Sequence, residues 1–327
     1  MFRLEPFVSS LNFMLLVYFA IPFALILFTL PAVIKKIRDR RFIVKDMYKH
    51  GFPEVPSNGG LVIVLIAFFS ISLTSLFYAK YIEPVNYTIM IVVALFAFFG
   101  LLDDIVNIGR PAKLVMLYYC SYALIPYAMT TLLYLPFIGP VDLGIVYLQL
   151  IIPTYVPVVA NLVNMHSGFN GLAPGLSLIV LATLILKTIA YGDVFTILFT
   201  VSLTGALAAY FFFENYPARI FWGNIGALAV GAAIGATIVV QGFIVSGFIM
   251  LIPHTANFLL YVYWRATKKY PEAKFGRIRD DGTVEVPNPL TLKWVLPYYF
   301  RMTERQATHA MFALTAIFCA IGFFVPG

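Results

Sequence analysis

Two adjacent carboxylates are the residues of this chain most suited to chemistry. Asp103 and Asp104 directly follow the apolar run 98–102. Removing a carboxylate from water without a partner costs on the order of several kcal/mol, and neighbouring carboxylates also repel each other. A membrane protein that keeps such a pair usually uses it, with a metal ion or a cationic group as the compensating partner. The pair therefore predicts a functional site that binds one or the other.

Further polar clusters interrupt the apolar pattern at 45–49, 161–170 and 214–224. They combine acidic, amide and basic side chains. Mg²⁺ prefers oxygen ligands and commonly binds together with substrate phosphates, while Lys and Arg bind phosphate oxygens directly. Glycines in or beside these clusters permit close approach of a ligand to the backbone. Together the clusters indicate a site for phosphorylated ligands.

The elements that position these clusters are membrane helices. The chain is 61% hydrophobic and 11% charged, outside the usual range of soluble domains. Its apolar stretches are long enough to cross a bilayer core of about 30 Å. They lie near 7–30, 59–78, 87–102, 113–135, 143–160, 171–190, 194–213, 223–240, 242–264 and 306–324. We predict an all-α, polytopic membrane protein with about ten transmembrane helices in a single domain, 1–327.

Charge orients this bundle. All Lys and Arg residues except Arg3, Lys80 and Lys187 fall in alternate connections, near 31–58, 103–113, 161–171, 214–223 and 265–305. The positive-inside rule makes these connections cytoplasmic and places both termini outside. The net charge of +7 needs no nucleic-acid partner, because this rule and anionic lipids of the bilayer account for it.

The same topology places every polar cluster on the cytoplasmic side, which favours an enzyme with a cytoplasm-facing active site. The alternative is a transporter or flippase of a phosphorylated or lipid substrate. Such proteins more often carry polar groups at mid-membrane and show two related halves.

The clusters resemble, in order, the motifs of the polyprenyl-phosphate N-acetylhexosamine-1-phosphate transferases. The matching segments are 46–60, 100–107 with Lys113, 161–172 and 215–223. Segments 257–261, 291–292 and 304–305 resemble the eukaryotic and archaeal branch, the UDP-GlcNAc:dolichyl-phosphate GlcNAc-1-phosphotransferases. The His-rich loop of the bacterial MurNAc-pentapeptide enzymes is absent from the sequence.

The resemblance implies a reaction and its partners. A polyprenyl or dolichyl phosphate attacks the β-phosphorus of a UDP-N-acetylhexosamine, most simply UDP-GlcNAc, and UMP is released. This is the first step of lipid-linked glycan assembly, as in protein N-glycosylation. Mg²⁺, or Mn²⁺ in its place, is the implied cofactor, and a homodimer is a compatible assembly. The short outer loops favour the plasma membrane of a prokaryote, archaeal or bacterial, with the archaeal one preferred.

The resemblance also implies site residues. Asp103, Asp104 and Lys113 are predicted to be catalytic, with Lys113 on a phosphate. Asn164 and Asn224 are predicted metal ligands. The predicted substrate-binding residues are Lys49, Glu54, Asn107, Asn170, Gly171, Arg219, Arg277 and Arg279.

One of these positions departs from the family pattern. Asn224 stands where the family usually has a metal-binding Asp. An Asn carbonyl still coordinates Mg²⁺ but brings no negative charge. Three outcomes stay open: a variant metal site, an altered metal preference, or a catalytically weak protein. In the first, Asp103 and Asp104 supply the missing charge.

Overall fold

The computed structural model describes residues 11–40, 42–106, 110–128, 130–135, 138–270 and 273–326, with only the backbone described for 110–113. The helices are α2 (Leu11–Asp39), α3 (Gly60–Tyr78), η1 (Ala79–Tyr81), α4 (Pro84–Val106), α5 (Arg110–Cys120), η2 (Ser121–Tyr127), α6 (Gly144–Val146), η3 (Tyr147–Ile151), α7 (Ile152–Met165), α8 (Leu172–Tyr191), η4 (Val194–Thr196), α9 (Leu198–Glu214), α10 (Gly223–Val240), α11 (Ile244–Met250), α12 (Ile252–Thr267), α13 (Leu292–Tyr299) and α14 (Glu304–Phe324). The strands are β1 (Ile43–Lys45), β2 (Glu54–Pro56), β3 (Leu132–Leu135), β4 (Gly139–Asp142), β5 (Arg277–Ile278) and β6 (Val284–Glu285).

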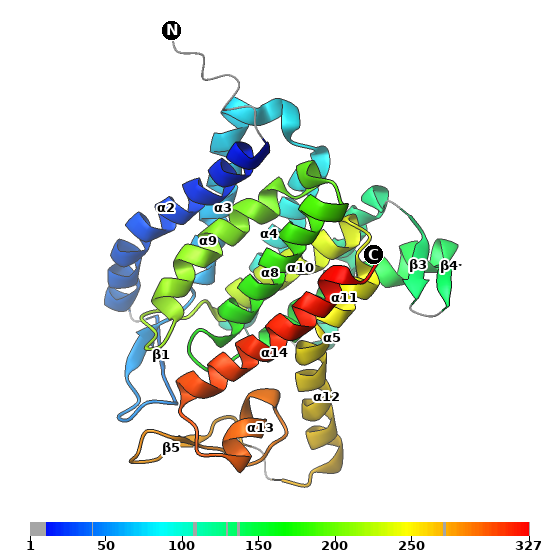
Figure 1. The fold of residues 1–327 in the computed structure, drawn as a ribbon. Coiled ribbons are helices and arrows are strands. Elements are labelled where there is room, and N and C mark those ends of the chain that lie inside the picture. Colours follow the sequence, from blue (N-terminus) through cyan, green and yellow to red (C-terminus); the bar gives the residue numbers. More distant parts are fainter. Residues whose placement is uncertain are drawn as a thin grey trace.

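Helix α10 is the centre of the bundle, with α4, α7, α3 and α8 packed around it (Figure 1). It is rich in Gly and Ala and is buried along nearly its whole length. A Cβ at Gly231 would lie 2.6 Å from Cα of Ala160, so the backbones of α10 and α7 are in direct contact. Small residues allow such close packing between membrane helices, where no hydrophobic effect drives association.

The predicted class, an all-α polytopic membrane protein, is confirmed. Within the described residues, seven helices are long and apolar enough to cross a membrane, and an eighth span arises if α11 and α12 are taken together. Two predicted spans correspond to shorter apolar helices, 114–127 and α9. Each of the ten predicted segments thus contains a helix, and the number that crosses the bilayer stays a prediction.

Two predicted spans were wrong in detail. The segment 242–264 is not one helix, because α11 and α12 meet at a 66° bend beside Leu251. The segment 113–135 ends in strand β3, which pairs antiparallel with β4. Both segments are predominantly apolar, and apolarity alone does not distinguish a bent helix or a strand from a straight span.

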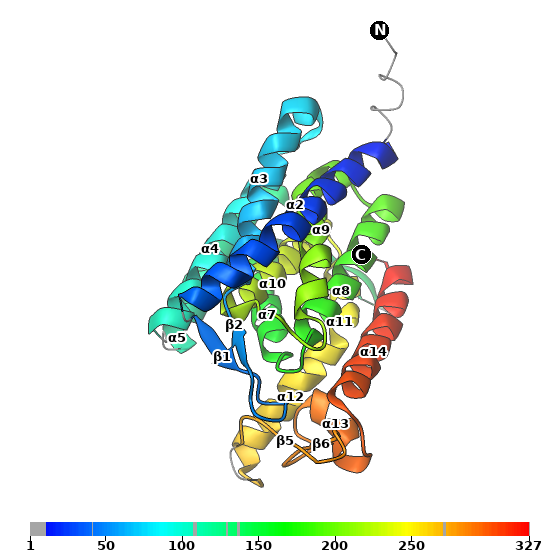
Figure 2. The same ribbon diagram turned by 90° about the vertical axis from the view of Figure 1, so that its left-hand side faces the viewer.

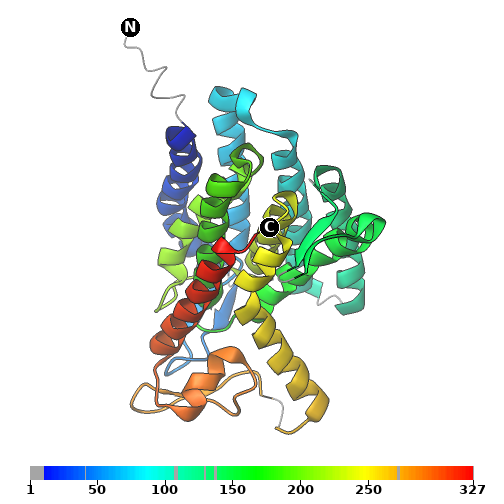
Figure 3. The same ribbon diagram turned by 45° about the vertical axis from the view of Figure 1, so that its right-hand side comes forward.

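Two further short hairpins, β1–β2 and β5–β6, lie with α13 at one end of the bundle (Figures 1 and 2). We call this the polar end. Helix α12 leads from the bundle down to the segment that carries α13, as Figure 3 shows. A second hydrophobic core lies here, separate from the membrane core, and joins Tyr48, Phe169, Val284, Trp294 and Met311.

Several helices extend further into the polar end than predicted. Helix α4 continues to Val106, so Asp103 and Asp104 lie in its last turns and not in a loop. Likewise α7 continues to Met165 and carries Asn164. The polar residues near the ends of these helices therefore have fixed positions relative to the bundle.

Candidate active site

The predicted polar clusters meet at the polar end. Hydrogen bonds link these clusters to one another and to two further segments of the polar end. The linked pairs are Asn224 and Asp103, Asn170 and Asp46, Ala218 and Asn170, Lys49 and Glu304, and Lys293 and Ser167. These contacts join segments that are up to 255 positions apart in the sequence. The convergence that the one-sided topology predicted is therefore present in the fold.

Asp103 and Asp104 lie against the N-terminus of α10. The side-chain amide of Asn224 donates to Oδ2 of Asp103 at 3.2 Å, and Asp104 accepts hydrogen bonds from the backbone N–H groups of Asn224 and Ile225. The positive end of a helix dipole and its free N–H groups stabilise carboxylates in this place. Asp103 is half-buried and Asp104 is exposed, so the pair is less desolvated than its apolar flank suggests.

Gly100 makes this approach possible. A Cβ at this position would lie 2.7 Å from the carbonyl oxygen of Asn224, so any larger residue would push α4 away from α10. One turn further along α4, this close packing delivers Asp103 and Asp104 to the first residues of α10.

Asn164 lies near the same helix terminus. Helices α7 and α10 run antiparallel, with Gly231 against Ala160 and Gly235 against Val156. In this register Asn164 is level with residue 227, about 4.5 Å along the axis from Asn224 at a rise of about 1.5 Å per residue. The two predicted metal ligands therefore lie at nearly the same level along the bundle axis.

The oxygen donors at this place suit Mg²⁺. Carboxylates of Asp103 and Asp104 and the amide oxygens of Asn164 and Asn224 are hard ligands of the kind that Mg²⁺ prefers. Among the described residues no group of three His, Cys, Asp or Glu side chains forms a complete metal cage. A magnesium ion held by one or two carboxylates and completed by substrate phosphates fits this donor set.

A second network surrounds Lys49. Its ammonium lies 3.3 Å from Oδ2 of Asp46, pairs with Glu304, and lies 4.3 Å from the ring centroid of Tyr216. Opposite charges and an aromatic face all stabilise a cation, and the two carboxylates are buried. The position of Lys49 is thus fixed by three different segments.

Asn170 joins the same network through its backbone N–H and both polar atoms of its side chain. Its N–H donates to Oε1 of Glu304 at 2.6 Å, and its Nδ2 donates to Oδ2 of Asp46 at 3.0 Å. Its Oδ1 accepts from the N–H of Ala218 at 2.9 Å, and the residue is 2% exposed. Gly171 follows at φ +68° and begins α8. In this structure Asn170 contacts protein groups, and its predicted role toward uracil stays a prediction.

A basic cavity opens beside Lys49. It has a volume of about 540 Å³ and lies between the β1–β2 turn and the segment before β5. Among the residues that the structure describes, its lining includes four basic side chains and no acidic one; the basic residues are Lys49, His50, Lys274 and Arg277. A concentration of positive charge in a concave surface favours a phosphorylated ligand.

The remaining predicted residues lie elsewhere. Arg279 donates to the carbonyl of Val284 at 3.1 Å and Arg219 to that of Phe212 at 3.1 Å, so both guanidinium groups support local backbone. Glu54 is an exposed residue of β2. Asn107 and the side chain of Lys113 lie outside the described residues.

Sequence reasoning missed two charged residues of the polar end, Glu304 and Lys293. Lys293 donates to the carbonyl of Ser167 at 2.5 Å and lies over the ring of Phe169. Burial lowers the pKa of Lys293 to about 8, and the nearby Glu304 opposes that shift. A single charged residue within a basic loop carries no sequence signal that marks it as part of a site. The sequence does indicate where Glu304 lies, because Thr303 and Gln306 have the spacing of a capping box. This capping box fixes the first turn of α14, which contains Glu304.

His166 packs edge-on against His254, with ring centroids 4.8 Å apart. Burial lowers the pKa of His166 well below its usual value, so the ring is neutral at pH 7. Neither ring nitrogen of His166 has a hydrogen-bond partner among the described groups. The pair connects α12 to the loop that follows α7.

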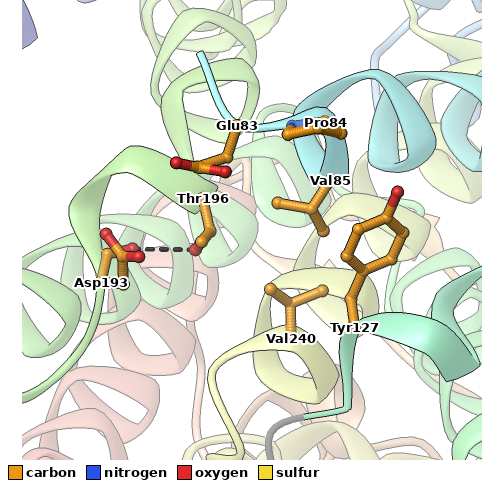
Figure 4. A pocket seen from close by; sticks show the side chains of 7 residues that line it. All are labelled: Glu83, Pro84, Val85, Tyr127, Asp193, Thr196 and Val240. Atoms are coloured by element: carbon orange, nitrogen blue, oxygen red, sulfur yellow. Dashed lines mark hydrogen bonds between the residues drawn. The ribbon is translucent and has the colours of Figure 1, made fainter. Parts of the chain in front are cut away.

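A smaller cavity lies at the opposite end of α10. Its volume is about 170 Å³. Its lining includes Glu83, Tyr127, Asp193, Thr196 and Val240 (Figure 4). The Asp193 carboxylate accepts from the N–H of Phe195, and Thr196 Oγ1 donates to the carbonyl of Asp193. These groups complete local turns, and Val240 ends the helix that Asn224 begins. This cavity is therefore separate from the candidate active site.

Comparison with known proteins finds a family match and several relatives. Residues 86–242 match the family model of glycosyl transferase family 4. A protein of Saccharolobus solfataricus, provisionally named UDP-N-acetylglucosamine–dolichyl-phosphate N-acetylglucosaminephosphotransferase, is 31% identical over 299 residues, covering 88% of this chain and 89% of that protein.

Of two further relatives, one carries the same name and the other a different one. A protein of Sulfolobus acidocaldarius with the same provisional name is 33% identical over 273 residues, covering 79% of this chain and 80% of its own. The phospho-N-acetylmuramoyl-pentapeptide-transferase of Clostridium botulinum is 33% identical over 193 residues, covering 55% of this chain and 57% of its own. The chain is thus similar to the archaeal proteins over most of its length and to the bacterial enzyme over about half.

Proposed function

The chain belongs to glycosyl transferase family 4, and on this basis we propose that it transfers GlcNAc-1-phosphate from UDP-GlcNAc to a dolichyl or other polyprenyl phosphate. The carrying observation is the similarity to the protein of Saccharolobus solfataricus over 88% of this chain, together with the family match over 86–242, which includes Asp103, Asn164 and Asn224. In the reaction, an oxygen of the lipid phosphate forms a bond to the β-phosphorus of UDP-GlcNAc. The bond from that phosphorus to the bridging oxygen breaks, and UMP leaves.

The residues of the polar end suit this chemistry. Lys49 and Arg277 line the basic cavity, where their positive charges would bind the diphosphate of the nucleotide sugar. Preorganised cations offset the charge that develops on oxygen atoms during phosphoryl transfer. A phosphate monoester with a second pKa of about 6 is largely ionised at neutral pH, so the lipid acceptor needs no general base.

The proposed cofactor is Mg²⁺, with Mn²⁺ as a substitute. Asp103, Asp104, Asn164 and Asn224 would hold it, and when bound it would neutralise charge on the substrate phosphates. Because Asn224 is neutral, Asp103 would provide the charge nearest to it. The hydrogen bond between these two side chains supports this division of roles.

We also propose the orientation of the protein. The basic connections lie at the polar end, which would face the cytoplasm of an archaeal cell across its plasma membrane. The C-terminal residues lie at the opposite end, where Lys187 donates to carbonyls of Gly322 and Val325. The proposal includes termini that face outward and about ten membrane crossings. The homodimer stays a prediction.

A transfer assay tests the proposal. Purified protein in lipid nanodiscs would receive labelled UDP-GlcNAc, a polyprenyl phosphate and Mg²⁺. We expect UMP and a labelled lipid in equal amounts, with large losses in the variants Asp103→Asn and Asn164→Ala. A transporter or flippase would move its substrate without releasing UMP.

A further inference from the structure

Glu304 is a buried carboxylate whose two oxygens contact two different loops. Oε1 accepts from the backbone N–H of Asn170 at 2.6 Å, and Oε2 pairs with the ammonium of Lys49. The residue is 2% exposed. Hydrogen bonds that involve a charged group are about twice as strong as neutral ones, so this single side chain is a strong link between the two loops.

The helix that carries Glu304 is itself well fixed. Thr303 and Gln306 form a capping box at its first turn, so Glu304 leaves the helix at a defined position. Helix α14 packs along α8, whose first residue follows Gly171. The distance between Glu304 and the loop before α8 is therefore set by the packing of two long helices.

The partner of Glu304, Lys49, forms part of the wall of the basic cavity. A lysine side chain has four rotatable bonds and loses up to about 2 kcal/mol of conformational entropy when it is fixed. Asp46, Glu304 and the ring of Tyr216 surround its ammonium and remove this freedom in the structure. A phosphate that enters the cavity thus meets a cation that is already in place.

We propose that Glu304 is a positioning residue that holds Lys49 at the cavity wall and the backbone of Asn170 in the loop, so that the cavity is preorganised for the diphosphate of the nucleotide. This inference rests on the proposed function. Glu304 touches neither substrate nor metal in this role and acts through Lys49. Preorganisation raises affinity because binding no longer has to order the groups that make the contacts.

A purely electrostatic role of Glu304 would have the opposite effect on phosphate binding, and the test separates this role from the positioning role. A carboxylate beside a cationic site lowers its positive potential, so a purely electrostatic role of Glu304 would weaken phosphate binding. In that case the variant Glu304→Gln would bind the diphosphate more tightly. Under the positioning role it would bind more weakly, because Lys49 would turn toward Asp46 and away from the cavity wall.

Equilibrium binding of UDP and of uridine to the full chain in nanodiscs tests the proposal. We expect Glu304→Gln to weaken UDP binding about tenfold or more, the usual effect of losing a charge-assisted hydrogen bond, and to change uridine binding less than about twofold. The matched control is Glu285→Gln, which removes an exposed carboxylate 4.0 Å from Arg279 and should leave both affinities unchanged. Equal losses for UDP and uridine, unchanged binding, or tighter UDP binding would each overturn the proposal.

A double-mutant cycle provides the second measurement. If Glu304 acts through Lys49, the double variant Lys49→Met, Glu304→Gln should bind UDP about as weakly as Lys49→Met alone. If the losses of UDP affinity in the two single variants instead add up in the double variant, Glu304 does not act through Lys49. If Glu304→Gln does not fold, the shorter Glu304→Asp keeps the charge and should show the same selective loss for UDP. A wild-type protein that binds no UDP at all would instead refute the proposed function.

Discussion

The side-chain amide of Asn224 donates to the carboxylate of Asp103 at 3.2 Å, joining the first turn of α10 to the last turns of α4. An aspartate at 224 would place a second carboxylate at this distance from the first. Two such groups repel unless a cation lies between them. The neutral amide thus allows the two helices to meet without bound metal.

The variant Asn224→Asp tests this relationship. We expect it to lower the thermal midpoint of the protein in EDTA, because two carboxylates then face each other, and to restore it in Mg²⁺. The Mg²⁺ concentration for half-maximal transfer should fall about tenfold, because the site gains one negative charge. A midpoint and a Mg²⁺ dependence both equal to those of the wild type would contradict the assignment of Asp103 and Asn224 to one metal site.

A buried lysine predicts a pH dependence of stability. The pKa of Lys293 is about 8 in the folded protein, below the ordinary lysine value of 10.5. At pH values between these two pKa values, the unfolded chain binds more protons than the folded protein. The contribution of Lys293 to the free energy of unfolding therefore rises with pH. Relative to Lys293→Met, the wild type should gain on the order of 1–2 kcal/mol between pH 7 and pH 9.5. Denaturation of both proteins at the two pH values measures this difference, and a constant difference would contradict it.

The loop before α8 depends on Gly168, which has φ +109°. A Cβ at this position would lie 2.3 Å from Nζ of Lys293. We expect Gly168→Ala to lower turnover at least tenfold, because alanine is strained at this φ and its Cβ clashes with Nζ of Lys293, which displaces the loop. In the control Gly282→Ala, a similar positive φ is strained but no atom lies within 4 Å of the added carbon, so turnover should change little.

Lys293 also offers a rescue of that variant. Because the clash is with the far end of a flexible side chain, Lys293→Ala should restore part of the activity lost in Gly168→Ala. Rates for the two single variants and the double variant decide this point. No recovery would mean that backbone strain alone causes the loss.

Tyr48 fixes the segment around β5 to the bundle. Its hydroxyl accepts from the N–H of Gly276 at 3.3 Å and from Nε1 of Trp294 at 3.1 Å, and burial raises its pKa to about 12, so it stays protonated. Tyr48→Phe should expose 273–303 to limited proteolysis and weaken UDP binding severalfold, because Arg277 lies in this segment. Tyr299→Phe, at an exposed position, is the control. Equal protease sensitivity of the two variants would contradict this role of Tyr48.

The sequence predicted the membrane helices and the meeting of the polar clusters because apolar length and the sidedness of charge determine both. It did not predict the bend at Leu251 or the strand β3, since both lie in predominantly apolar segments. Glu304 was missed as a site residue because its partner, Lys49, lies 255 positions away and only the packing of α14 brings them together. Arg279 was predicted beside Arg277, but the local β5–β6 turn directs it to the carbonyl of Val284.

The most direct test of the central claim follows the β-phosphorus. Protein in nanodiscs is incubated with UDP-GlcNAc labelled at the β-phosphate, a dolichyl phosphate and Mg²⁺, and the products are separated. We predict that the label moves to the lipid, that unlabelled UMP is released in equal amount, and that Asp103→Asn abolishes both. Label found in free UDP, with GlcNAc alone on the lipid, or UMP released without a labelled lipid, would contradict the account.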